Sequence, residues 1–296
     1  MTLLASATSL ERRADGAADA VDRPAASRRL NHDVVRALLS KDMAAARRSR
    51  SIVLPMLVVP FVLLVGLPVG IAIYARAGTP PDLGRFLEQL PGPIARDLSA
   101  LPAQQRLLEL VLGYLVAPLF LIVPMMISSA LAADSFAGEK ERRTLESLLH
   151  LPVEERDLFV SKVLFAFLPT VAVSWIGFAL YSVAANVVAW PVMGRVFVPT
   201  WRWVGLIVFL APAVAMLGLG VMVRVSARAR TTQEANQLGG AVIMPLILAS
   251  VGQTSGLLMM EPYWIFVASI VVWAIALLLV RGGLRRFTRD RVASRL

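Results

Sequence analysis

The feature that most constrains the fold of this chain is a series of six apolar segments, each about as long as a helix that crosses a bilayer. None carries a charged residue in its middle, and Glu109 and Lys162 lie near segment ends, where long side chains reach the interface. Since backbone groups in lipid must bond within their own segment, the pattern predicts an all-α polytopic membrane protein. The six predicted transmembrane helices occupy residues 52–75, 107–133, 158–189, 203–223, 238–258 and 263–280, within a transmembrane domain of residues 51–281.

Composition agrees with a lipid environment and excludes several kinds of chemistry. Hydrophobic residues make up 57% of the 296 residues, whereas soluble domains contain about 45–50%. The chain has no cysteine and only two histidines, His32 and His150, so we expect neither a catalytic thiolate nor a metal site. It also has no Gly-Lys dipeptide, and therefore no G-x-x-x-x-G-K-[ST] phosphate loop. We expect no catalytic residue, no ATPase site and no cofactor bound by this chain.

Charge predicts how the helices are oriented. The net charge is +10. Of the 30 Lys and Arg residues, 24 lie in the two terminal segments and in every second connection between the predicted spans, which are all on one side of the membrane. Those segments are residues 1–50, 134–162, 224–237 and 281–296. Because positive charge collects on cytoplasmic loops, we expect both termini to be cytoplasmic and the protein to lie in the cytoplasmic (inner) membrane. The membrane explains the basic charge, so we expect lipid contacts and no nucleic-acid partner.

The regions outside the spans have different predicted structures. Residues 1–30 resemble a disordered cytoplasmic tail, and residues 282–296 a basic cytoplasmic tail. Within residues 31–50, helical spacing gathers five apolar residues on one face: Val34, Val35, Leu38, Leu39 and Met43. This pattern predicts an amphipathic interfacial helix. The alternative is a plain basic flank before the first span.

A charged stretch separates the second and third predicted spans. Thr144 can cap a short helix in which Leu145, Leu148 and Leu149 share one face, and Pro152 ends it. Such a short helix is unstable alone, so it must pack on the underside of the bundle or on another protein. Charges of both signs beside the leucines favour another protein over lipid headgroups.

This stretch resembles the hallmark segment of ABC-2 type permeases, the membrane subunits of ATP-binding cassette exporters. The matching residues are Gly138, Glu139, Lys140, Glu141, Arg142, Thr144, Leu145, Glu146, Leu148, Leu149, Pro152 and Lys162. Arg143 stands where the family often has glycine. The resemblance implies that the segment is a cytoplasmic coupling helix between spans 2 and 3, which docks on a nucleotide-binding ATPase subunit. In the inner loop 226–240, it implies a second contact at Thr232, Gln233 and Glu234.

The resemblance further implies a permease that exports its substrate, with ATP and Mg bound by the partner ATPase. A second permease copy, identical or similar, would complete the pathway. The sequence looks most like the sodium-export-type branch, but nothing in it selects a substrate. Gly66 and Gly70 are four residues apart in the first span, a spacing that suits packing within the chain or a dimer contact.

Two other classes of function remain open. A secondary transporter or channel is one, although secondary transporters usually need charged residues within their spans. A membrane scaffold or assembly factor is the other, because a scaffold can also bind an ATPase.

Overall fold

A computed structural model of the chain describes residues 30–77, 98, 100–117, 119–141, 153–229, 231–241, 244 and 263–293. No strand occurs among these residues, and the predicted all-α architecture is confirmed. Contacts within the chain divide it into two units, Met1–His32 and Asp33–Leu296, and the second contains all of the helical stretches that could cross a membrane among the described residues. Five helical stretches in the described part are long and apolar enough to cross a membrane: Met56–Tyr74, Ala103–Gly138, Glu155–Met193, Trp201–Ser226 and Tyr263–Arg285. The predicted span 238–258 lies outside the described residues except for 238–241 and 244, so the count of six stays a prediction.

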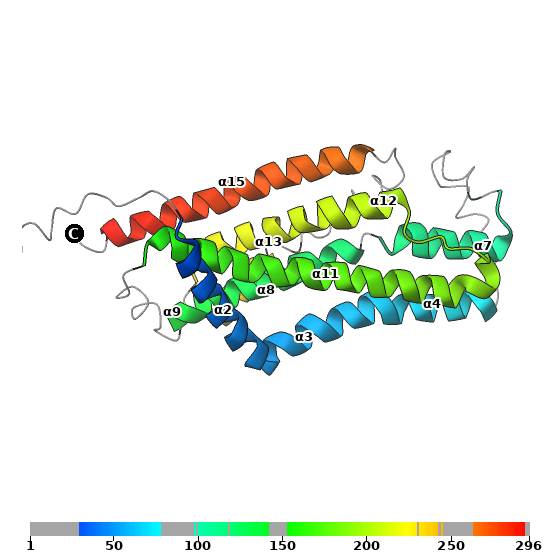
Figure 1. Cartoon of the computed structure of the whole chain (residues 1–296), viewed down its shortest axis with the longest axis horizontal. Coiled ribbons are helices and arrows are strands. Elements are labelled where there is room, and N and C mark those ends of the chain that lie inside the picture. Colours follow the sequence, from blue (N-terminus) through cyan, green and yellow to red (C-terminus); the bar gives the residue numbers. More distant parts are fainter. Residues whose placement is uncertain are drawn as a thin grey trace, which may run out of the picture. The chain divides into compact units, whose positions relative to one another are not determined.

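The five stretches are built from helical elements that follow one another along the chain (Figure 1). The first contains α3 (Arg50–Phe61), η1 (Val62–Gly66) and α4 (Leu67–Ala77); the second contains α7 (Ala103–Leu108), η2 (Glu109–Leu115), α8 (Leu119–Ala133) and η3 (Asp134–Gly138), and leads into α9 (Glu139–Glu141). The third is α11 (Glu155–Met193); the fourth contains α12 (Trp201–Val204), η4 (Gly205–Leu210) and α13 (Ala211–Ser226); the last is α15 (Tyr263–Ala293). The four η elements are π-helical turns, wider than the α-helix.

The helix α2 (His32–Arg48) precedes the first span, over the residues where an interfacial helix was expected. Val35 is buried, and the other four predicted apolar residues are partly sheltered. Arg36, Lys41 and Arg48 are exposed. Helical spacing therefore separates an apolar face from a basic one, and Figure 1 shows α2 lying at an angle to α3.

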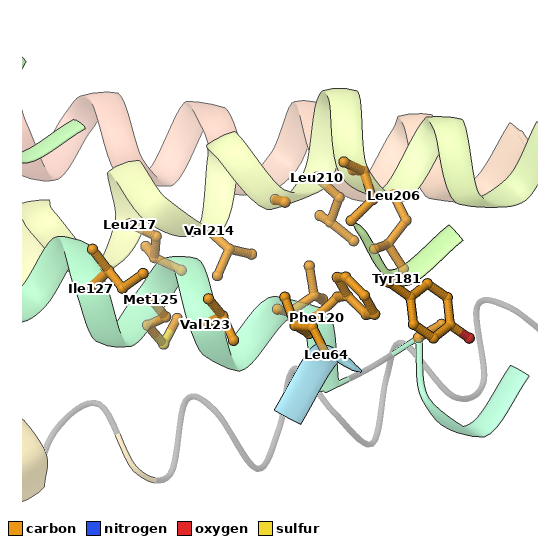
Figure 2. Packing of buried hydrophobic residues seen from close by; sticks show 14 of the residues in the cluster. Leu64, Phe120, Val123, Met125, Ile127, Tyr181, Leu206, Leu210, Val214 and Leu217 are labelled. Atoms are coloured by element: carbon orange, nitrogen blue, oxygen red, sulfur yellow. The ribbon is translucent and has the colours of Figure 1, made fainter. Parts of the chain in front are cut away.

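The core of the bundle surrounds the fourth span. Twelve of the 16 residues of α13 are buried, and its most extensive contacts are with α8 and α15. Gly218 allows α8 to come close, because a Cβ there would lie 3.0 Å from the hydroxyls of Ser128 and Ser129. Figure 2 shows Val214 and Leu217 facing Met125 and Ile127. Small residues thus give the fourth span its central position.

An aromatic cluster fills the part of the core farther from α2. Phe120 packs edge-on against Phe178, Tyr181 and Trp203, at centroid distances of 6.0, 4.9 and 5.0 Å. These rings come from α8, α11 and α12, and Figure 2 shows Phe120 and Tyr181 near Leu206. The cluster therefore joins three spans.

We name the two ends of this bundle by residues described below. The Lys162 end includes α2, α9, the start of α11 and the end of α13 (Figure 1). The Glu109 end includes α7, η2, the end of α11 and α12.

Candidate functional site

A buried lysine ties the second span to the third at the Lys162 end. The Lys162 side chain, near the start of α11, is 1% exposed and forms an ion pair with the Glu139 carboxylate. Its ammonium also donates a hydrogen bond to the Ser135 carbonyl, at 2.7 Å, and lies 5.6 Å from the centre of the Phe136 ring. The expectation that Lys162 reaches the interface is therefore wrong. An ammonium without partners in an apolar interior would be strongly unfavourable. The Glu139 carboxylate and the Ser135 carbonyl therefore take the place of the water that would otherwise solvate Lys162.

The backbone that receives Lys162 is the π-helical turn η3. Ser135, Phe136, Ala137 and Gly138 are all buried there. A π-helical turn changes the regular α-helical hydrogen-bonding pattern, and such turns are frequent at functional sites. Here the turn carries both the Ser135 carbonyl and the Phe136 ring that contact Lys162.

The next carboxylate along the chain binds a different element. Glu141 Oε2 accepts hydrogen bonds from both the backbone N–H and the hydroxyl of Thr232, each at 2.9 Å. Gly138 lies beside this contact, because a Cβ on it would be 3.2 Å from Thr232 Oγ1. The structure thus brings together the hallmark segment and the second predicted contact segment.

Thr232, Gln233 and Glu234 begin a helix rather than lying in the middle of a loop. Residues 232–241 are helical, whereas an inner loop was expected over 226–240. Thr231 precedes this helix, and its hydroxyl accepts a hydrogen bond from the Glu234 N–H at 3.1 Å. Thr231-x-x-Glu234 has the spacing of a capping box, a sequence signal that could have predicted the helix start. Thr231 was not among the predicted site residues.

Helix α2 meets the same region. Asp42 lies close enough to Lys162 for electrostatic attraction. A small cavity of about 100 Å³ separates α2 from the bundle, and Asp42, Asp134, Glu139 and Phe165 are among its lining residues. Helix α2, the second span and the third span therefore meet around the Lys162–Glu139 ion pair.

Other predicted site residues are not brought to this point by the described structure. Arg142, Thr144, Leu145, Glu146, Leu148 and Leu149 lie outside the described residues, as does the side chain of Lys140. Gly66 and Gly70 are exposed, and a Cβ on either would meet nothing within 4 Å. Packing within the described part of the chain therefore does not use this glycine pair, and a dimer contact there stays a prediction.

At the Glu109 end, uncharged side chains bind the backbone of η2, and Arg202 of α12 donates a hydrogen bond to the Tyr114 hydroxyl of the same turn at 2.8 Å. In the π-helical turn η2, the Leu112 carbonyl accepts a hydrogen bond from the Tyr181 hydroxyl, and the Gly113 carbonyl accepts one from Trp203 Nε1 at 3.1 Å. One ion pair, Arg195 to Glu109 at 3.0 Å, adds a charged contact, with the Arg195 side chain 56% exposed.

Asn186 holds the loop that follows α11. Its side-chain oxygen accepts a hydrogen bond from the Phe197 N–H at 3.0 Å, and its amide nitrogen donates to the Ser182 and Val198 carbonyls. The amide therefore bonds both to its own helix and to the loop.

Several serine and threonine hydroxyls within the spans bond to their own helices. Ser128 and Ser129 both donate to the Met125 carbonyl, and Thr170 donates to the Ala166 carbonyl at 2.7 Å. These short local bonds satisfy the hydroxyls without a partner helix or a water-filled pathway.

Comparison with known families supplies the assignment. A search of curated proteins finds no match to the chain. A family model described as an ABC-2 family transporter protein matches residues 36–265, which runs from α2 to the start of α15 and includes η3, α9 and Lys162. The match covers well over half of the 296 residues. Together with the helical membrane architecture, it means that this chain belongs to the ABC-2 transporter family and is a multi-pass membrane permease of an ABC transporter.

Proposed function

We propose that the chain is the permease subunit of an exporter and that its Lys162 end faces the cytoplasm. Two copies, or one copy and a similar chain, would form the pathway, with lipid around them. Family membership implies an ATP-binding subunit, and we propose that this separate subunit binds ATP and Mg and hydrolyses the ATP. The lopsided Lys and Arg distribution supports the orientation.

One observation carries the proposed coupling mechanism. Two carboxylates of the short α9 contact different elements: Glu139 pairs with Lys162 of the third span, and Glu141 binds Thr232 at the start of helix 232–241. Since α9 runs directly into residues 142–149, a force on those residues would act on both contacts. This arrangement supports a coupling site made of residues 138–149 and 232–234.

In the proposed cycle, ATP binding closes the ATPase subunits and displaces residues 142–149. The displacement moves α9, and the spans joined to α9 repack between two arrangements, one open to each side of the membrane. Packed helices favour such discrete arrangements over continuous bending. The chain itself carries out no covalent chemistry in this scheme.

Affinity purification from native membranes tests the ATPase contact. We expect an ATPase subunit to copurify with the wild type and to be lost with Leu148→Asp. Val196→Asp makes the same chemical change at an exposed position of the Glu109 end and should retain the ATPase. Absence of any ATPase from the wild-type complex in mild detergents would contradict the proposal. Equal copurification with wild type and Leu148→Asp would exclude Leu148 as a contact.

The absence of cysteine makes the orientation directly measurable. Single cysteines at Glu141 and Val196 can be labelled in intact cells with a maleimide that does not cross membranes. We expect Val196→Cys to react in intact cells and Glu141→Cys only after the membrane is opened. The reverse pattern would contradict a cytoplasmic Lys162 end.

A further inference from the structure

Two apolar cavities meet along the boundary between the first span and α11. One, of about 400 Å³, is lined by residues that include Val53, Leu57, Phe165 and Val173. The other, of about 360 Å³, continues towards the middle of the bundle and also has Leu57 and Val173 in its wall. Because they share these residues, the cavities adjoin one another, and we call the two together the α3–α11 groove.

The length of the α3–α11 groove matches one leaflet of a bilayer. Its lining on the first span extends from Val53 to Val65. At 1.5 Å per residue, this stretch is about 18 Å long, close to half of a hydrocarbon core of about 30 Å. The lining of the groove is almost wholly aliphatic and aromatic, and Phe61, Ile176 and Leu180 lie in the cavity farther from α2. An extended hydrocarbon chain fits these dimensions.

The mouth of the groove at the Lys162 end carries a basic residue. Arg47, in the last turn of α2, lines the groove together with Met43 and Ala46. Arg47 is exposed, and it comes four residues after Met43, so helical spacing places both residues on the side of α2 that borders the groove. An arginine at the end of an apolar groove favours an occupant with a negative head and a hydrocarbon body.

We propose that the α3–α11 groove binds one anionic phospholipid, with its phosphate at Arg47 and one acyl chain along the groove. A transmembrane helix of a second copy would cover the apolar wall but would give Arg47 no anion, so the lipid is the better occupant. The inference uses only the groove and α2, and it holds whether or not α9 couples to an ATPase.

The test uses the full-length chain in vesicles of equal amounts of dioleoylphosphatidylglycerol and dioleoylphosphatidylcholine. The protein is extracted into mild detergent, and native mass spectrometry counts the lipids that remain bound. Arg47→Gln removes the charge at the mouth, and Arg48→Gln is the matched control on the same turn. Ala172→Phe fills the groove at an exposed lining residue, and Ala179→Phe makes the same change on α11 outside it.

We expect the wild type to retain phosphatidylglycerol in preference to phosphatidylcholine. Arg47→Gln should reduce that preference about fivefold, the effect of one basic residue at a membrane surface. Ala172→Phe should reduce retention of both lipids, while Arg48→Gln and Ala179→Phe should behave like the wild type. Equal retention of the two lipids by the wild type would overturn the proposal. Identical results for the two arginine variants, or a lipid-free dimer, would also overturn it.

Discussion

The two ends of the bundle use π-helical turns in similar ways but bind them with different side chains. At the Lys162 end, the Ser135 carbonyl of η3 accepts a hydrogen bond from a buried ammonium that also pairs with Glu139. At the Glu109 end, two carbonyls of η2 accept hydrogen bonds from the uncharged groups of Tyr181 and Trp203. In both cases a side chain from another span binds the turn.

The difference lies in how each end could rearrange. Uncharged side-chain bonds inside an aromatic cluster are lost only when packed rings separate. A buried ion pair can exchange partners, and Asp42, which is paired with Lys41 at 3.7 Å, lines one cavity together with Glu139. We infer that the Glu109 end acts as a fixed clamp on its three spans, and the Lys162 end as the part that changes.

Removal of the buried charge should have the largest effect on stability. Lys162→Met leaves the Glu139 carboxylate, whose side chain is 13% exposed, without its ammonium partner. Breaking a buried pair from one side costs about 3–5 kcal/mol of stability. We expect a clearly lower thermal unfolding temperature in detergent, partly restored by adding Glu139→Gln. A double variant no more stable than Lys162→Met alone would contradict this role of the ion pair.

The clamp at the Glu109 end is tested by Tyr181→Phe. The change keeps the ring in the cluster but leaves the Leu112 carbonyl without the tyrosine hydroxyl. An unsatisfied buried acceptor costs about 1–3 kcal/mol, so the unfolding temperature should fall, by less than for Lys162→Met. Because a clamp holds without switching, ATP hydrolysis by the assembled complex should stay at its wild-type rate below that temperature. Loss of hydrolysis in a folded Tyr181→Phe complex would contradict the clamp.

A smaller effect is expected at the contact between α9 and helix 232–241. Thr232→Val removes one of the two hydrogen bonds to Glu141, a loss of about 0.5–1.5 kcal/mol. Thr232→Ser keeps the hydroxyl and serves as the matched control. Stability should change little, while ATP hydrolysis by the complex should change with Thr232→Val only. Identical hydrolysis in both variants would show that this hydroxyl has no part in coupling.

The smallest effect should come from the exposed ion pair. Arg195→Gln removes the pair with Glu109, whose arginine is largely in solvent. Exposed pairs contribute about 0.2–1 kcal/mol, and salt screens them. We expect a small decrease in unfolding temperature that disappears at high salt. A decrease as large as that of Lys162→Met would remove the distinction between the two ends.

Local patterns were enough to predict much of the fold. Apolar length is a property of a single segment, so the helical membrane architecture followed from it. The spacing of Val35, Leu38 and Leu39 likewise predicted one sheltered face in residues 31–50, and α2 has that face. The hallmark residues around Gly138 and Glu139 led to the same family that the comparison shows.

Contacts between distant segments could not be predicted in this way. Lys162 looked like an interfacial residue because its partner, Glu139, comes from another span. Gly66 and Gly70 have a common packing spacing, yet the close approach occurs at Gly218, against Ser128 and Ser129. Spacing shows that two helices can approach closely, but only the assembled bundle decides which helices do.

In the proposed mechanism, α9 transmits nucleotide binding to the rest of the permease. Spin labels on Arg36→Cys of α2 and on Arg228→Cys just after α13, both exposed at the Lys162 end, allow a pulsed distance measurement in the purified complex. We expect ATP with vanadate to shift the distance in the wild-type background and in Glu154→Ala, an exposed control at the same end. Glu141→Ala should abolish the shift while the ATPase still copurifies. An undiminished shift in Glu141→Ala would contradict the claim.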